Sequence, residues 1–369
     1  MDFKVKYIGL QRSYESHKEE LNKVFERVMS EGSFILRDDV REFEQSISSF
    51  LGAKYAVGVN SGTDALFLSC KIAGIKKGDE VLTVGHTFVA TLSAIYHCGA
   101  KPILIDIADD YNIDVTKIEE KITKNTKAII PVHLNGRACQ MDKIVEIANK
   151  YDLIIIEDAC QSVGAKYNNQ HVGTFGKFGC FSLHPMKSLN CAGDGGYIIL
   201  NDEQDYQRLI SLRNHGQSSD KKIIYEYGYS SRLDNLQAAI ANIRLKDLSN
   251  NNKKRRKIAQ KYNLELSSLP LTLHSDMSNN QYYDVFNSYV IRTEKRDALY
   301  QFLIDNKIEV FIHIPQPLSE QKALNLDGSN LIQNKKISKE ILSLPIYPEL
   351  THEELDYIIL IIKKFFEEN

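Results

Sequence analysis

The chain has 369 residues, of which 43% are hydrophobic and 25% are charged, an ordinary balance for a globular protein. Its net charge of −2 gives no reason to expect nucleic acid or an acidic membrane as a partner. No apolar stretch reaches the ~18 residues that a membrane span needs, and the N-terminal residues lack the apolar core of a signal peptide. We therefore expect no membrane association and a cytoplasmic location.

The first half of the sequence alternates between strand and helix patterns after two helices at residues 14–30 and 38–51. This alternation predicts an α/β fold, with a mostly parallel sheet covered by helices on both faces. Ligands of such a sheet gather at the carboxyl ends of its strands. The predicted strands are 55–59, 80–84, 102–105, 128–133 and 153–157, and the predicted helices are 63–73, 89–98, 114–123 and 141–151.

The second half is predicted to complete this sheet and to add a smaller α+β domain. Strands at 178–182 and 197–201 enclose a loop that contains Lys187, and residues 202–265 read as helices. We expect a large domain over residues 1–250 and a small domain over 251–369. The further predicted elements are strands at 288–292 and 310–314 and helices at 295–306 and 352–368.

Two features of composition have an unremarkable interpretation. The basic run at residues 253–257 is the only dense positive cluster, and we expect a solvated helix face there. The six cysteines form no Cys-x-x-Cys pair and no metal-ligand cluster, which favours reduced thiols and no metal site.

Three strand ends carry candidate site residues, each with a plainer alternative. The run Asn60-Ser-Gly-Thr-Asp64 suits a phosphate at a helix N-terminus, although an ordinary N-cap explains it too. Asp158 follows a buried strand, where a carboxylate needs a positive partner, unless it caps the next helix. Gln161 lies a short step further on. Phe88 fits a ring-stacking aromatic or a core residue.

Lys187 lies in a loop dense in glycine and small residues, with Ser182 five positions before it. A lysine that forms a Schiff base needs such rigid backbone, partial shielding and a depressed pKa. An anion site, a carboxylate, an aromatic and a lysine together meet the needs of pyridoxal phosphate: phosphate anchor, partner of the ring nitrogen, ring support and imine.

With these motifs the sequence resembles the DegT/DnrJ/StrS family of pyridoxal-phosphate (PLP) nucleotide-sugar aminotransferases, which have the aspartate aminotransferase fold (PLP transferase fold type I). The resemblance covers essentially the whole chain. It is carried by the stretches 32–36, 59–66, 79–81, 131–136, 156–161, 179–196, 228–239, 313–317 and 342–348.

The resemblance implies a role for each matching residue. Lys187 corresponds to the catalytic lysine that forms the imine with the cofactor, Asp158 to the partner of the pyridine nitrogen and Gln161 to that of the ring hydroxyl. Cofactor contacts are further implied for Gly62, Thr63, Phe88, Ser182 and Ser230, and substrate contacts for His184 and His313.

The implied reaction transfers the amino group of L-glutamate to a keto group of a nucleotide-linked deoxysugar, for amino-sugar and glycan biosynthesis. A homodimer is also implied, with residues 225–235 contributing to the partner's site. The chain departs from the family at Ser230, where Asn is usual and reaches the partner's phosphate, and at Ile314, where Tyr is frequent. Asp194 stands where many members have Glu, which favours amination at carbon 3 over carbon 4.

Two other functions fit the same fold. Sugar 3-dehydratases resemble this family but have histidine in place of the lysine, so Lys187 argues against that activity. Because fold alone does not determine function, a non-catalytic regulatory protein on the same fold is the second alternative. Such a protein would have no need of the lysine, so Lys187 argues against it too.

Overall fold

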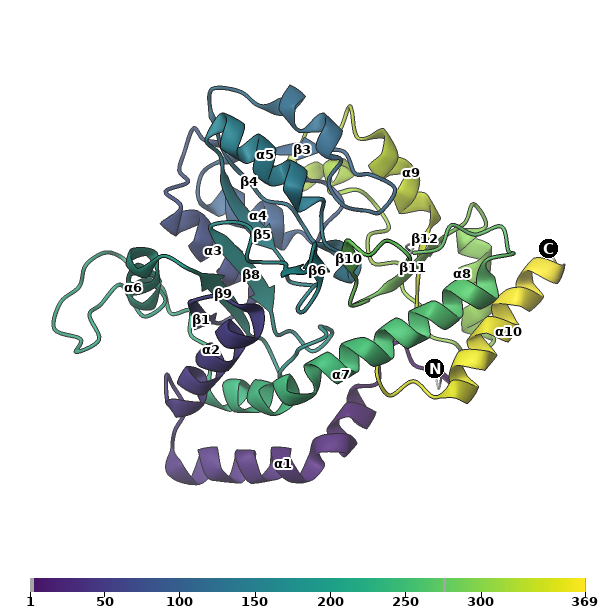
Figure 1. Cartoon of the computed structure of the whole chain (residues 1–369), viewed down its shortest axis with the longest axis horizontal. Coiled ribbons are helices and arrows are strands. Elements are labelled where there is room, and N and C mark those ends of the chain that lie inside the picture. Colours follow the sequence, from purple (N-terminus) through teal and green to yellow (C-terminus); the bar gives the residue numbers. More distant parts are fainter. Residues whose placement is uncertain (1–2, 275–276, 369) are drawn as a thin grey trace.

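The centre of the molecule is a seven-stranded sheet with the strand order β1-β9-β8-β5-β4-β2-β3 (Figure 1). The structure is a computed structural model that describes residues 3–274 and 277–368. The strands of this sheet are β1 (Tyr55–Val59), β2 (Glu80–Val84), β3 (Lys101–Ile105), β4 (Thr126–Ile129), β5 (Ile154–Asp158), β8 (Phe178–Ser182) and β9 (Gly196–Leu200).

Within this sheet, only β9 runs against the other strands. It pairs antiparallel with both β1 and β8, while β3, β2, β4, β5 and β8 pair in parallel. The predicted α/β fold with a mostly parallel sheet is therefore confirmed. Since the parallel strands share a direction, the residues that follow β1, β2, β5 and β8 meet at one edge of the sheet.

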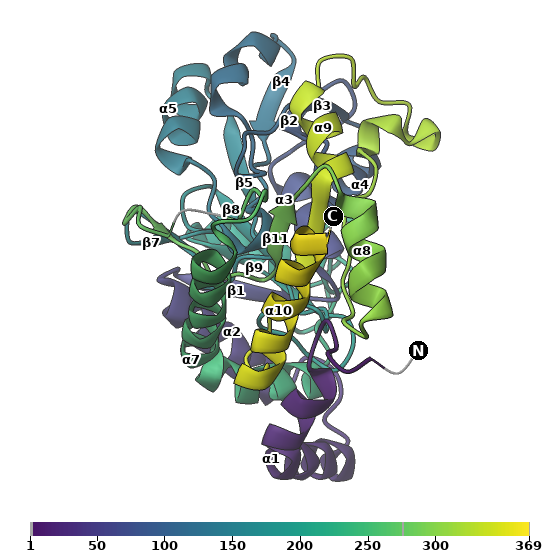
Figure 2. The ribbon, with the colours of Figure 1, turned by 90° about the vertical axis from the view of Figure 1, so that its right-hand side faces the viewer.

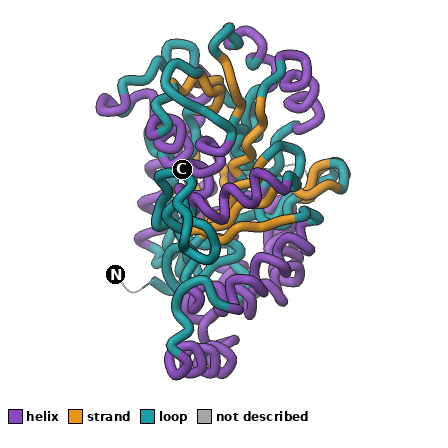
Figure 3. Tube along the Cα trace, turned by 90° about the vertical axis from the view of Figure 1, so that its left-hand side faces the viewer, coloured by secondary structure: helices purple, strands orange, loops and turns teal. Residues whose placement is uncertain are grey.

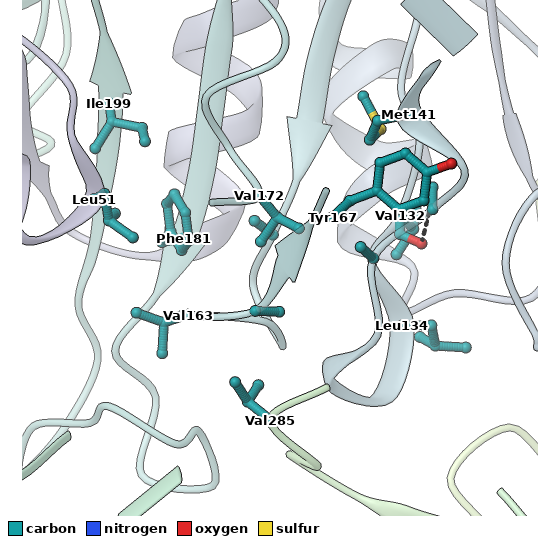
Figure 4. Packing of buried hydrophobic residues seen from close by; sticks show 14 of the residues in the cluster. Leu51, Val132, Leu134, Met141, Val163, Tyr167, Val172, Phe181, Ile199 and Val285 are labelled. Atoms are coloured by element: carbon teal, nitrogen blue, oxygen red, sulfur yellow. Dashed lines mark hydrogen bonds between the residues drawn. The ribbon is translucent and has the colours of Figure 1, made fainter. Parts of the chain in front are cut away.

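Helices cover both faces of the sheet (Figure 3). Both faces need this cover, because side chains that alternate along each strand point to opposite sides. One hydrophobic cluster joins the sheet to α2 (Asp38–Leu51), α5 (Met141–Tyr151) and α7 (Asn235–Leu266), and Figure 4 shows part of it, with Phe181 and Ile199. A second cluster on the other face joins the sheet to α3 (Gly62–Ile72), α4 (Ala90–His97) and α6 (Glu203–Leu212).

The C-terminal part has its own apolar core around the two-stranded sheet of β11 (Tyr289–Arg292) and β12 (Ile341–Leu344). The helices α8 (Arg296–Asp305) and α10 (His352–Glu368) and the end of α7 enclose it (Figure 2). The remaining elements are α1 (Leu10–Glu31), α9 (Ile332–Glu340) and the small sheet of β6 (Lys166–Tyr167), β7 (Gln170–His171) and β10 (Tyr282–Tyr283), besides short 3-10 turns.

The helix α7 is continuous across residue 250, where we expect the large domain to end. Its first half packs in the cluster under the sheet, and Ile258, Tyr262 and Leu266 pack in the C-terminal core. The division into domains at residue 250 remains a proposal, and one helix links the two parts.

Three predictions are wrong. The helices expected over 202–265 are interrupted, because residues 213–234 between α6 and α7 form no α-helix. Residues 114–123 form two short 3-10 turns rather than an α-helix, with the Asp114 carboxylate accepting from Thr116 N. Their apolar residues Val115 and Ile118 are three apart, a spacing that 3-10 geometry serves as well. The predicted strand at 310–314 makes a single bridge, Phe311 to Ser343, and the prolines at 315 and 317 follow it.

The basic run also differs from the prediction of a solvated helix face. Arg255 is buried and its guanidinium donates to the carbonyls of Phe286 and Ile346. Arg256 donates to the carbonyl of Asp284 and lies over the ring of Tyr283. Part of this positive charge therefore holds the C-terminal part of the chain together.

All six cysteines have free thiols. In the part of the chain that the structure describes, no helix is both long and apolar enough to cross a membrane.

Gly136 allows residues 285–288 to approach the loop after β4. Its φ is +98°, and a Cβ atom built on it would lie 2.6 Å from the backbone nitrogen of Phe286. Gly52 also has a positive φ, +78°, but a Cβ atom there would meet nothing within 4 Å.

We therefore expect Gly52→Ala to lower the free energy of unfolding by about 1 kcal/mol, through backbone strain alone. Gly136→Ala adds a backbone clash and should cost at least about 2 kcal/mol more. Urea unfolding of both variants measures the difference. Equal losses would contradict the close approach at Gly136.

Candidate active site

The candidate site residues lie at the predicted edge of the sheet. Gly62 and Thr63 begin α3 directly after β1, and Phe88 lies between β2 and α4. Asp158 ends β5, and Ser182 ends β8. The fold thus brings together residues that are up to 120 positions apart in the sequence (from 62 to 182).

The N-terminus of α3 combines both interpretations of its sequence. The Ser61 hydroxyl is an ordinary cap and accepts from Asp64 N at 3.1 Å. This cap uses the amide of the third helical residue, and the amides of Gly62 and Thr63 belong to the same first turn, where helices offer N–H groups to anions. The prediction of a phosphate site is compatible with the cap.

Gly62 makes room at this end of the site. A Cβ atom built on it would lie 2.8 Å from Cβ of Ser182 and 2.9 Å from Sγ of Cys160. The segments after β1, β5 and β8 therefore form one tight cradle that only glycine fits. The Ser182 hydroxyl oxygen accepts from His184 N at 3.2 Å.

Asp158 is only 5% exposed, and both of its carboxylate oxygens are hydrogen-bonded. Cys160 N donates to Oδ1 at 3.2 Å, and the Thr91 hydroxyl donates to Oδ2 at 2.8 Å. No α-helix follows Asp158 directly, so the alternative of a helix cap does not hold. A buried carboxylate held in this way can face a cation such as a protonated ring nitrogen.

Glu157, the residue before Asp158, points to the opposite face and anchors the strand. Its buried carboxylate accepts from three backbone amides, those of Gly173, Phe175 and Gly176, at 2.6–2.7 Å. It also contacts Nε2 of His133 at 2.9 Å. This role of Glu157 was not predicted from the sequence, although the alternation of side chains along a buried strand indicates it.

Gln161 is held by the loop after β4. Its side-chain oxygen accepts from Asn135 N at 2.9 Å, which leaves the amide group as a donor. A donor at this position suits the predicted contact with a ring hydroxyl.

The Lys187 loop is held by hydrogen bonds to its own backbone groups. Lys187 N donates to the carbonyl of His184 at 2.8 Å, and the Asn190 side chain donates to the carbonyls of Pro185 and Lys187. Desolvation lowers the pKa of Lys187 below its ordinary 10.5, and the nearby groups of Cys160 and Asp158 oppose this shift. Among the described residues we find no hydrogen bond to its ammonium group.

Phe88 is 68% exposed, so it is no core residue, and its ring is available to a flat ligand. The side chains of two other predicted residues have local hydrogen-bond partners. His184 is exposed, and its Nδ1 accepts from Met186 N within its own loop. The Ser230 hydroxyl accepts from Arg232 at 2.9 Å.

His313 faces Lys187 from the C-terminal part of the chain. Although part of the His313 side chain is exposed, desolvation lowers its pKa to about 4, and the charge of Lys187 acts in the same direction. The imidazole is therefore neutral at ordinary pH. Its Nε2 lies 2.7 Å from the hydroxyl of Tyr7, a buried residue whose pKa rises to about 12 through desolvation. Nothing in the sequence pattern around Tyr7 indicated this contact.

These residues fit pyridoxal phosphate. The cradle at Gly62 accepts a phosphate, Asp158 a ring nitrogen, Phe88 a ring face and Lys187 an aldehyde. Within residues 3–274 and 277–368, no cluster of His, Cys, Asp and Glu could hold a metal ion. The fold and the site thus define a PLP-dependent enzyme of the aspartate aminotransferase type.

Comparison with known proteins identifies the family. The model of the DegT/DnrJ/EryC1/StrS aminotransferase family matches residues 15–363, and the chain belongs to this family. The chain is 39% identical to a pleiotropic regulatory protein of Geobacillus stearothermophilus, over 98% of both chains. It is 38% identical to dTDP-3-amino-3,6-dideoxy-alpha-D-galactopyranose transaminase of Aneurinibacillus thermoaerophilus, over 98% of this chain and 99% of the relative.

Solved structures agree with this assignment. The X-ray structure of DesV from S. venezuelae superposes with a TM-score of 0.95 at 33% identity, over 98% of both chains. Related structures carry the cofactor in its PLP or PMP form. The protein is therefore a PLP-dependent aminotransferase, and the resemblance seen in its sequence is confirmed.

The lowered pKa of Lys187 has a measurable effect on the protein without cofactor. Between the folded and the unfolded pKa, the unfolded chain binds more protons, so stability rises with pH up to about 10.5. Lys187→Met removes the cost of burying this charge. We expect a higher free energy of unfolding than in the wild type at neutral pH, and a difference that shrinks as pH rises.

Urea unfolding of the apoprotein over a pH series tests this expectation. Lys124→Met is the matched control, because Lys124 is exposed, and its effect should not depend on pH in this way. A Lys187→Met protein less stable than the wild type at neutral pH would contradict the desolvation of Lys187.

Proposed function

We propose that the protein transfers the amino group of L-glutamate to a keto group of a nucleotide-linked deoxysugar. The observation that carries this proposal is the intact set of Asp158, Ser182 and Lys187 around the cradle at Gly62, in a chain of this family. Relatives at 33–38% identity are named as transaminases of nucleotide-linked sugars, which supports the substrate class. The six free thiols are consistent with a cytoplasmic location.

In this proposal each residue has one task. When bound, the cofactor supplies an aldehyde for the amino group and a ring that takes up electrons. Gly62, Thr63 and Ser182 bind its phosphate, and Asp158 holds the proton on its ring nitrogen. Lys187 Nζ, whose lowered pKa favours the free amine, would take the proton from the α-carbon of the amino donor and deliver it to the carbon that carried the cofactor's aldehyde.

We propose amination at carbon 3 of the sugar rather than carbon 4. Asp194 supports this assignment, and so do the names of four relatives, which concern a 3-amino or 3-oxo sugar. Asp194 is exposed in the loop between Lys187 and β9, where a substrate group can reach it.

We also propose that the protein acts as a homodimer with shared active sites. The loop after α6 projects from the body of the molecule (Figure 1) and exposes apolar side chains to a degree that a solvated loop does not need. Tyr227 is 99% exposed, and Ile223, Ile224 and Tyr225 are also exposed. Such a surface suits a partner subunit, with the nearby Ser230 facing the partner's site.

The reaction is tested by incubating the protein with glutamate and a panel of 3-keto and 4-keto nucleotide sugars. We expect amination of a 3-keto sugar by the wild type. Lys187→Met should show no turnover and no trapping of the cofactor by borohydride, because it lacks the amine. Cofactor that binds but does not react with glutamate would favour a regulatory protein.

The dimer is tested with the variant Ile224→Ser/Tyr227→Ser. Loss of two exposed apolar contacts should raise the dimer dissociation constant at least about tenfold, as measured by sedimentation velocity. Tyr151→Ser, at an exposed tyrosine of α5, is the control and should leave it unchanged. A wild type that is monomeric and fully active at nanomolar concentration would refute the shared site.

A further inference from the structure

The two threonines of the turn that carries Phe88 form a short chain of hydroxyl groups leading to Asp158. Thr87 Oγ1 lies 2.9 Å from Thr91 Oγ1, which lies 2.8 Å from Asp158 Oδ2. Both threonines are buried, Thr87 with 2% and Thr91 with 0% of its surface exposed. Thr87 lies in the bend before α4 and Thr91 in its first turn, so the two hydroxyls meet at the start of this helix.

The direction of these hydrogen bonds follows from proton counting. The Thr91 hydroxyl has one proton, and its neighbours include two groups that only accept: the carboxylate of Asp158 at 2.8 Å and the carbonyl of Phe88 at 3.3 Å. The proton goes to the carboxylate, since this contact is shorter and charge-assisted. Thr87 must then donate to Thr91.

The same turn fixes the aromatic ring. Thr91 N donates to the carbonyl of Phe88 at 3.3 Å, so Phe88 and Thr91 move together. Phe88 limits where the face of the cofactor ring lies, and Asp158 limits where its nitrogen lies. A link between them sets both positions at once.

We propose that Thr91 and Thr87 are positioning residues that hold the Asp158 carboxylate toward the ring nitrogen of the cofactor. This inference rests on the proposed role of Asp158. Oδ1 accepts from Cys160 N, and the Cys160 thiol also lies within hydrogen-bond reach of the carboxylate. Without Thr91, Oδ2 loses the hydrogen bond that holds it, and the carboxylate can turn about its Cβ–Cγ bond. Thr87 supports Thr91 by donating its hydroxyl proton to Thr91 Oγ1, which keeps the Thr91 hydroxyl oriented toward Asp158.

The test is the affinity of the apoprotein for pyridoxal phosphate and the position of the visible absorption band of the bound cofactor. Thr91→Val should raise the dissociation constant about tenfold, the loss expected of one hydrogen bond to a charged group, and shift the band. Thr91→Ser keeps the hydroxyl and should stay within about twofold of the wild type. Thr87→Val should cause a smaller loss, about threefold.

Thr83→Val is the matched control. Thr83 is buried on β2, and its hydroxyl donates to the carbonyl of Ile130 at 2.9 Å, away from Asp158. Like the other two variants, Thr83→Val loses one buried threonine hydroxyl. It should leave the affinity for pyridoxal phosphate and the absorption band unchanged.

Asp158→Ala separates the two levels of the proposal. If it leaves affinity and absorption as in the wild type, the proposed role of Asp158 fails. If Asp158→Ala changes both while Thr91→Val and Thr87→Val match the wild type, the role of Asp158 stands and the positioning role of the two threonines is overturned. If Thr91→Val does not fold, the other two variants decide. A Thr87→Val protein with wild-type affinity and absorption, or a tenfold loss of affinity in Thr91→Ser, overturns the positioning role of the threonines.

Discussion

Two adjacent carboxylates at the end of β5 determine how the site is built. Because neighbouring residues of a strand point to opposite faces, Glu157 enters the core while Asp158 enters the site. Glu157 is saturated by three amides and His133, and breaking such a buried network costs several kcal/mol. The register of β5 is thereby fixed, and with it the position of Asp158.

The environment of the site is asymmetric in charge. Asp158 receives hydrogen bonds that suit its charged form, whereas Lys187 has no such support among the described residues and its pKa falls. His313 and the Cys160 thiol are both neutral at ordinary pH, since desolvation lowers the pKa of the former and raises that of the latter. A fixed carboxylate beside an amine whose pKa is lowered is a suitable setting for proton transfer from carbon.

The sequence allowed most of the sheet to be predicted, because its strands are short apolar runs with clear ends. The strands 55–59, 80–84 and 178–182 were predicted with the bounds that the structure has. Prediction failed where tertiary contacts decide: α9 and β12 were missed, and residues 310–314 lack the ladder their pattern suggests.

The candidate site could be predicted to a similar extent. Asp158, Gly62 and Lys187 lie in recognisable local motifs. Tyr7 does not, because its contact with His313 joins residues 306 positions apart, and no local pattern records such a pairing. Thr91 lies between these cases, since its spacing from Thr87 is visible but its acceptor is not.

The helix α7 connects the segment after Lys187 to the C-terminal part of the chain. Near its start, Gln237 accepts from Ala192 N, and Arg244 donates to Asn190 and Cys191 in the segment that follows Lys187. About one turn beyond its middle, Arg255 donates to the carbonyls of Phe286 and Ile346. A rotation of the C-terminal part must therefore bend this helix or move the Lys187 loop with it. Unless the helix bends, His313 and Lys187 move together as one rigid body.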